Sequence, residues 1–276
     1  MDGLLITILI VTGFLVYKMI SSSRKQEGYK RWKATGSGDT ANEETAGNKW
    51  KHGAWLRHAL GVTTPKARTY PVFDEEAVVW CAGLLGVEAV RLKEILQDVS
   101  SHYREFWIRK RKGGYRMISA PDKELKSIQD TIYHRILLPV NVHPVATGFR
   151  RQHSIVDNVR PHLGKRCVLK TDIHDFFLSI RSPRVKQTFE NIGYPKNISK
   201  VLGELCCRRR HLPQGASTSP ALSNIIAYEM DRKLAAMAEE FGLAYTRYAD
   251  DLTFSGDVFP KEQVLVRVKE IIREEK

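Results

Sequence analysis

The chain has 276 residues, enough for one large domain or two modest ones, and its hydrophobic fraction of 42% is ordinary for a globular protein. Its 44 lysines and arginines outnumber its 31 aspartates and glutamates, and the net charge of +13 favours nucleic acid or an anionic membrane surface as a partner; a soluble protein that is merely basic is the alternative. The four cysteines form no CxxC pair, which excludes a zinc spacing and a secreted disulfide framework and indicates a reducing compartment.

The chain begins with an apolar stretch. Residues 4–17 (LLITILIVTGFLVY) are nearly all apolar, and with the next three residues they are about the shortest stretch that spans a bilayer as a helix. Basic residues follow the stretch and none precedes it, so the positive-inside rule places its C-terminal side in the cytoplasm. A cleaved signal peptide has the opposite charge order. We therefore expect residues 1–20 to form a transmembrane anchor; a signal peptide and a buried helix are the alternatives.

A polar segment then leads into the folded part. Residues 21–49 are rich in Ser, Gly, Thr and Glu, a composition that predicts a flexible linker. Folded sequence is expected from Trp50 onward. Residues 74–96 have apolar positions at helical spacing behind an acidic start and predict one or two helices. Residues 106–119 predict a hairpin that turns at a Gly-Gly pair.

The second half of the chain mixes strands and helices. A short strand over residues 168–171 ends at Asp172, and a second hairpin over residues 243–256 turns at Ala249 and Asp250. Helical patterns occur at residues 123–138, 184–192, 197–207, 219–241 and 261–275.

Acidic residues occur at the ends of two of these strands, in KTDIHDFF (residues 170–177) and YADD (residues 248–251). Nucleotide joining uses two divalent cations about 4 Å apart, which activate the attacking hydroxyl and stabilise the leaving pyrophosphate. Mg²⁺ prefers oxygen ligands such as carboxylates. A hairpin tip that holds Asp250 and Asp251 beside Asp172 would provide them, whereas a bare Asp-Asp pair is usually a solvated turn.

The motifs resemble those of bacterial reverse transcriptases. YADD is similar to motif C of that family, KTDIHDFF to motif A, LPQGASTSPALSN (residues 212–224) to motif B, and GGYRMISAPDKELKSIQ (residues 113–129) to the fingers segment, all in the family's order. The resemblance implies an α/β (α+β) right-hand polymerase, with fingers over residues 50–166 and palm over residues 167–276.

The resemblance also assigns the reacting groups. Asp172, Asp250 and Asp251 would be the catalytic residues and, with the carbonyl of Ile173, would hold two Mg²⁺ ions, which Mn²⁺ can replace. The residues expected to contact the incoming dNTP are Arg116, Asp175, Phe177, Gln214 and Gly215.

Each of these contacts has a chemical reason. Arg116 would grip the triphosphate with its planar fork, and the ring of Phe177 would exclude a 2′-hydroxyl. Gly215 would let the backbone approach the nascent base pair closely. A helix-start acid for Asp175, core packing for Phe177 and a solvated charge for Arg116 are the alternative interpretations.

One further motif indicates the subfamily. NVRPH at residues 158–162 resembles the NAxxH element of retron-type reverse transcriptases, with Val159 where Ala is usual. Asn158 and His162 are therefore expected to touch a structured RNA, although a buried His is more often structural. Arg109 and Lys110 are expected to bind template or primer phosphates, with a solvated surface as the alternative.

The retron resemblance implies RNA-directed DNA synthesis. The expected partners are a structured non-coding RNA that serves as template and primer, its cDNA, dNTPs and an effector protein in antiphage defence. With the anchor, the expected location is the inner (cytoplasmic) membrane, with the catalytic domain in the cytoplasm. The sequence ends 25 residues after Asp251, so a chain truncated before the thumb is expected.

Three alternatives remain open from the sequence. A non-retron bacterial reverse transcriptase would carry the same motifs. An RNA-templated RNA polymerase usually has GDD and a smaller gate residue. An inactive, membrane-tethered RNA-binding fragment would fit the missing thumb, although the intact aspartates argue against it.

Overall fold

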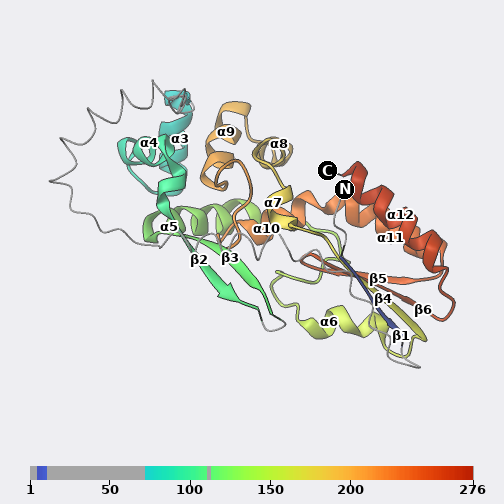
Figure 1. Ribbon diagram of the computed structural model, residues 1–276. Helices are drawn as coiled ribbons and strands as arrows, with labels where there is room; N and C mark the ends of the chain where they lie inside the picture. Colours follow the sequence, from blue (N-terminus) through green and yellow to red (C-terminus); the bar gives the residue numbers. More distant parts are fainter. Residues whose placement is uncertain (1–4, 11–71, 111–112, 276) are drawn as a thin grey trace, which may run out of the picture.

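The computed structural model describes residues 5–10, 72–110 and 113–275. These residues form a four-stranded sheet, a body of packed helices at one end of it, and a separate two-stranded hairpin (Figure 1). The arrangement is the mixed α/β architecture that the sequence predicts.

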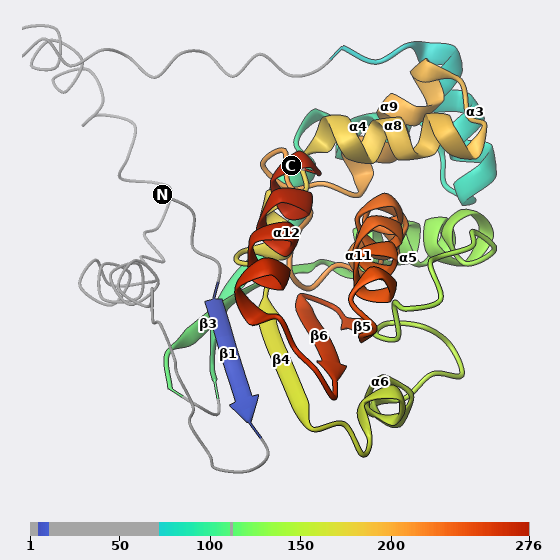
Figure 2. The same cartoon turned by 90° about the vertical axis from the view of Figure 1, so that its right-hand side faces the viewer.

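The strands of the large sheet are antiparallel and lie in the order β1-β4-β6-β5 (Figure 2). Their bounds are β1 Leu5–Ile10, β4 Cys167–Asp172, β5 Ala244–Tyr248 and β6 Asp251–Gly256. The register sets Asp172 opposite Asp251, which in turn lies opposite Tyr248. The predicted strand and the predicted hairpin, with its turn at Ala249 and Asp250, are therefore confirmed, and they bring the acidic residues to one end of the sheet.

Other elements cover both faces of β5 and β6. Side chains along each strand alternate between these two faces. Helices α11 (Tyr228–Glu240) and α12 (Lys261–Glu274) run along one face (Figure 1). On that side Tyr245 and Phe254 stack with their ring centroids 4.6 Å apart. Helix α6 (Ile155–Val159) and the single turn η4 (Arg160–His162) lie on the other face.

The helical body contains α3 Glu75–Leu85, α4 Ala89–Gln97, α5 Lys123–Ile132, α8 Ser182–Ile192 and α9 Lys196–Leu205. Helix α9 packs against the other four helices. Sequence signals mark several helix ends: the Asp122 carboxylate accepts the N–H of Leu125 (2.8 Å), and Gly86 ends α3 in the left-handed conformation (φ 71°). Residues 74–96 thus form two helices, as predicted.

Two predicted long helices are divided. The helix expected at residues 123–138 continues beyond α5 as a π-helical turn, η3 (Tyr133–Leu137). The helix expected at residues 219–241 is α10 (Ser219–Ile226) followed by α11, with a change of direction at Ala227. Helix α10 packs on α8 and η3, whereas α11 packs on β5 and α12. A continuous helix could not follow both surfaces, and sequence periodicity does not contain this information.

The remaining elements complete the surroundings of the acidic residues. They are η2 Val99–His102, β2 Tyr103–Arg109, β3 Tyr115–Pro121 and α7 Phe176–Ser179. Strands β2 and β3 form the predicted hairpin, which is longer than expected because pairing extends to Tyr103 and Pro121.

The N-terminal segment differs from the expected transmembrane helix. Residues 5–10 form strand β1, which pairs with β4 from Leu5 opposite Asp172 to Ile10 opposite Cys167. A short apolar run rich in β-branched residues suits a strand as well as a helix, and its periodicity cannot distinguish the two. In the described part of the chain, no helix is both long and apolar enough to cross a membrane. The rest of the expected anchor and the linker at residues 21–49 lie outside the described residues.

Candidate active site

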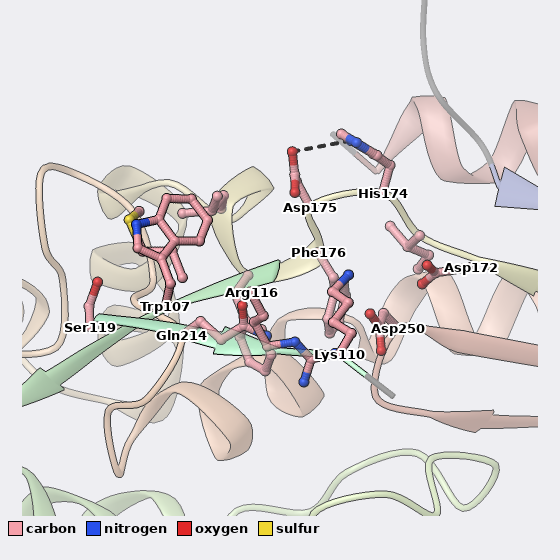
Figure 3. Close-up of a pocket in the computed structure, with 14 residues that line it drawn as sticks. Trp107, Lys110, Arg116, Ser119, Asp172, His174, Asp175, Phe176, Gln214 and Asp250 are labelled. Carbon is pink, nitrogen blue, oxygen red and sulfur yellow. Dashed lines mark ion pairs between the residues drawn. The ribbon is translucent and has the colours of Figure 1, made fainter. Parts of the chain in front are cut away.

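The three predicted catalytic aspartates come together at the end of the sheet. Asp172 is the last residue of β4 and lies opposite Asp251, the first residue of β6. The N–H of Ile173 donates to the carbonyl of Asp250 (2.9 Å), which fixes the end of β4 to the hairpin turn. Asp172 and Asp250 line a cavity of about 300 Å³, and Figure 3 shows both carboxylates at one side of it.

Asp251 has a different environment. Its Oδ2 lies 2.8 Å from Nζ of Lys170, two residues before Asp172 on β4. Over the described residues, no three His, Cys, Asp or Glu side chains are gathered closely enough to hold a metal ion. Two carboxylates at the cavity nevertheless match the usual protein contribution to a Mg²⁺ site, which is completed by substrate phosphates and water. The donors therefore fit Mg²⁺, and Asp251 would join them by turning away from Lys170.

A buried ion pair supports the turn that carries Asp250. Nη2 of Arg247 lies 2.6 Å from Oδ2 of Asp231 on α11, and both side chains are 0% exposed. Nη1 of Arg247 donates to Oδ1 of Asn224 and to the carbonyl of Ala249, both at 3.0 Å. Ala249 has a φ of 58°, a left-handed conformation that favours glycine. The Arg247 guanidinium thus stabilises this strained turn by donating to the carbonyl of Ala249.

The same network includes a phenol. Tyr245 donates its hydroxyl proton to Oδ1 of Asp231 (3.0 Å), and burial together with the Asp231 charge raises the pKa of Tyr245 well above its ordinary value of 10.0. The phenol therefore remains a donor, and the carboxylate of Asp231 accepts bonds from both Tyr245 and Arg247.

The β2–β3 hairpin forms the opposite wall of the cavity. It contributes Trp107, Lys110, Arg116, Met117 and Ser119. In Figure 3, Arg116 and Lys110 lie between Trp107 and Asp250. Two cationic side chains facing two carboxylates across an open space suit an anionic ligand that is bound together with a cation.

Motif B connects this hairpin to the floor of the cavity. The N–H of Ser119 donates to the carbonyl of Gln214 (2.8 Å), and the side chain of Gln214 lines the cavity. A Cβ atom on Gly215, whose φ is 126°, would lie 2.8 Å from Cγ2 of Ile118 and 2.9 Å from the carbonyl oxygen of Ser119. Close contact with β3 therefore requires a glycine here, and the expected approach to a base pair stays a prediction.

The two predicted contact residues of motif A flank the start of α7, and both line the cavity. Asp175 has a φ of 51°, and its Oδ2 lies 3.3 Å from Nδ1 of His174. It occupies the N-cap position of α7, as the alternative interpretation as a helix-start acid expects, although its side chain makes no capping bond. Phe177 is half-buried, with its ring 5.7 Å from that of Phe176.

Asn158 and His162 are bonded inside the protein. Asn158 is buried, and its Oδ1 accepts the hydroxyl of Thr147 (2.9 Å). The ring of His162 bonds to the hydroxyls of Ser255 (2.6 Å) and Thr246 (2.8 Å). Burial lowers the pKa of His162 below its ordinary value of 6.5. These bonds connect the α6 and η4 segment to Thr147 and to the sheet, as the structural alternative for His162 expects, and contact of Asn158 and His162 with RNA stays a prediction.

The predicted phosphate-binding residues lie at the tip of the β2–β3 hairpin. Arg109 is exposed at the end of β2. Lys110 lines the cavity, and its N–H donates to the carbonyl of Gly114 (3.0 Å) to close the hairpin. Sequence reasoning missed Trp107 as a lining residue. Its partner across the hairpin is Met117 of β3, which also lines the cavity.

Comparisons with known proteins agree with this geometry. Residues 108–275 match the family model described as reverse transcriptase (RNA-dependent DNA polymerase). The chain is 37% identical over 179 residues to the retron Ec86 reverse transcriptase of Escherichia coli, covering 64% of this chain and 55% of that protein. It is 38% identical over 193 residues to the retron Mx65 reverse transcriptase of Myxococcus xanthus, covering 63% and 45%.

A third relative extends the match. The retron Mx162 reverse transcriptase of Myxococcus xanthus is 32% identical over 255 residues, covering 84% of this chain and 52% of that protein. The chain thus spans about half the length of the curated relatives that it matches. The resemblance to retron-type reverse transcriptases is confirmed, and the cavity lies where the fingers hairpin meets the palm of this α/β polymerase fold.

Proposed function

Because the chain belongs to the reverse transcriptase (RNA-dependent DNA polymerase) family, we propose that it catalyses RNA-templated synthesis of DNA in a retron-like system. The observation that carries the proposal is the pairing of Asp172 with Asp251 beside Asp250, at a cavity whose other wall bears Lys110 and Arg116. Acidic and basic groups on opposite walls suit a nucleoside triphosphate bound with divalent cations.

In this proposal each residue at the cavity has a separate role in binding or catalysis. Arg116 and Lys110 bind the triphosphate and orient its α-phosphate toward the primer hydroxyl. Phe177 lies against the sugar, where a 2′-hydroxyl would clash with the ring. Asp172, Asp250, Asp251 and the Ile173 carbonyl would hold a pair of Mg²⁺ ions, which when bound would activate the attacking hydroxyl and stabilise the leaving pyrophosphate. Mn²⁺ can replace Mg²⁺ in such an oxygen site.

The partners follow from the same proposal. The names of the relatives identify them as retron reverse transcriptases, and we propose a structured non-coding RNA as template and primer, with the product DNA linked to that RNA. A net charge of +13 supports a polyanionic partner. A role in antiphage defence with an effector protein belongs to the same proposal.

Primer extension on an RNA template, with dNTPs and Mg²⁺, tests the activity. We expect Asp250→Asn to lower the rate by roughly 10²–10³-fold, the loss typical of removing one group that stabilises transition-state charge. Asp257→Asn is the matched control, because Asp257 is an exposed aspartate after β6 that does not line the cavity. Circular dichroism should show both variants folded. Full activity in Asp250→Asn would refute the catalytic assignment, and incorporation of rNTPs in preference to dNTPs would refute the reaction.

A further inference from the structure

Phe149 has an unusual conformation next to the candidate active site. Its φ is 61°, in the left-handed region that bulky residues rarely adopt, and 44% of its surface is exposed. An exposed aromatic residue gains little from burial that would offset such a conformation. Backbone strain of this kind persists only where the surroundings impose it, and it concentrates at functional sites.

The segment before Phe149 is fixed to the strand that leads into the catalytic turn. Ala146 pairs with Arg247 in a parallel bridge. The N–H of Arg247 donates to the carbonyl of Val145, and the N–H of Thr147 donates to the carbonyl of Arg247, both at 2.8 Å. The backbone around Phe149 is therefore aligned directly with β5.

Gly148 brings the segment against the turn itself. A Cβ atom at this position would lie 2.8 Å from the backbone nitrogen of Ala249, so any side chain would force the segment away. Nδ2 of the buried Asn224 donates to the carbonyl of Gly148 (2.9 Å). Asn224 also accepts a bond from Arg247, so one side chain joins the segment to the network beneath the turn.

Held in this way, the ring of Phe149 lies against two rings of the site. Its centroid is 6.1 Å from that of Phe177 and 6.4 Å from that of Tyr248. Phe177 lines the candidate active-site cavity, whereas Phe149 is not part of that lining and instead borders a neighbouring cavity of about 220 Å³. The ring of Phe177 also contacts that of Phe176, whose ring in turn lies under the guanidinium of Arg247, with 5.7 Å between that guanidinium and the ring centroid.

We propose that Phe149 is a positioning residue for sugar selection, which acts by preventing the ring of Phe177 from moving away from the cavity. The inference rests on the proposed function. A steric gate discriminates against a 2′-hydroxyl only as strongly as its ring resists displacement, because a ring that yields removes the clash. Both Phe149 and Phe176 contact the ring of Phe177, and both are connected to Arg247, Phe176 through its ring and Phe149 through the backbone of its segment.

The test compares incorporation of a single rNTP and the matching dNTP by the full chain. In Phe149→Ala, we expect the ratio of kcat/KM for rNTP to that for dNTP to rise roughly tenfold, the size of effect that small changes in an apolar pocket produce. The rise should come from a lower KM for the rNTP. Phe149→Tyr, which keeps the ring, should retain the wild-type ratio. Gln152→Ala is the matched control, because Gln152 is an exposed residue of the same loop with a φ of 62°.

A double mutant separates positioning from direct contact. If Phe149 acts through Phe177, adding Phe149→Ala to Phe177→Ala should leave the ratio of the single Phe177 variant unchanged. A further rise in the double mutant would overturn the proposal, as would an unchanged ratio in a folded Phe149→Ala variant. A wild-type chain that extends no primer would contradict the proposed function instead. The same ratio is then measured as Kd values for rNTP and dNTP on a complex of the chain with template and primer, which requires no turnover.

Discussion

At the scale of single residues, the aspartates could be predicted and their supports could not. Asp172, Asp250 and Asp251 stand out because their types and strand-end positions match the needs of Mg²⁺. Arg247 and Asp231 lie in a strand and a helix with no distinguishing pattern, yet they make the buried ion pair beneath the turn. Gly215 was identified correctly as a restricted position, and the structure adds a restriction by β3, a neighbouring strand that only the folded chain brings close.

Breaking the buried pair should destabilise the protein. Asp231→Asn keeps the shape of the side chain but leaves the Arg247 guanidinium in a fully buried site without its counter-charge. We expect the free energy of unfolding to fall by about 3–5 kcal/mol. Urea denaturation measures this change, and Asp130→Asn, which removes a half-exposed partner of Lys126, should cost about 1 kcal/mol or less. Equal losses in the two variants would contradict the importance of the buried pair.

At the scale of secondary-structure elements, type was easier to predict than continuity. The β2–β3 hairpin and the hairpin that carries YADD were recognised from alternation and turn residues. The break at Ala227 was missed, because it depends on α10 and α11 packing against different neighbours. The partners of α6 and η4 were not predicted, since nothing in the sequence shows that Asn158 bonds to Thr147 or that His162 bonds to Ser255.

The attachment of η4 to the sheet should depend on pH. Burial lowers the pKa of His162 in the folded protein below its ordinary value of 6.5. When the pH is below 6.5, the unfolded chain therefore binds a proton at His162 more readily than the folded chain does. Stability is therefore expected to fall as the pH drops through 6.5, until the folded pKa is reached. Denaturant titrations between pH 5 and about pH 8 should show this loss in the wild type and a smaller loss in His162→Gln. An identical pH dependence in the two proteins would contradict the assignment.

Proline substitutions can test whether residues 5–10 form strand β1 or a helix. One of two neighbouring N–H groups on a strand faces the paired strand, so proline at only one of Thr7 and Ile8 should remove a hydrogen bond to β4. We expect one of the variants Thr7→Pro and Ile8→Pro to lower Tm by a few degrees, about 1 kcal/mol, and the other to have a clearly smaller effect. Equal Tm values for both variants and the wild type would show that β1 contributes nothing to the fold.

At the scale of the whole molecule, the order of the motifs predicted the sheet end of the site but not how the cavity is closed. Closure depends on contacts between the β2–β3 hairpin and the segment before α10. The side chain of Arg208 pairs with Glu105 of β2 and donates to the hydroxyl of Ser119 (3.3 Å), while Ser119 also bonds to Gln214. Arg208 is the first of three consecutive arginines in the sequence, and the structure places its side chain between the two parts. Pairings of this kind follow from the three-dimensional arrangement and leave no periodic signal in the sequence.

Mutation at the tip of the β2–β3 hairpin tests whether RNA binds at a localised part of this protein, whose net charge is +13. Binding of RNA by phosphate contacts releases counterions, so the logarithm of the association constant falls linearly with the logarithm of the salt concentration. We expect Arg109→Ala to weaken RNA binding about equally for different sequences and to make this slope shallower by about 1, because one phosphate contact is lost. Fluorescence anisotropy over a salt series measures both quantities. Lys269→Ala is the charge-matched control, since Lys269 is an exposed residue of α12, the helix that covers the sheet away from the hairpin (Figure 1). Equal changes of slope in both variants would mean that RNA responds to total charge, and that the hairpin tip is not a localised contact.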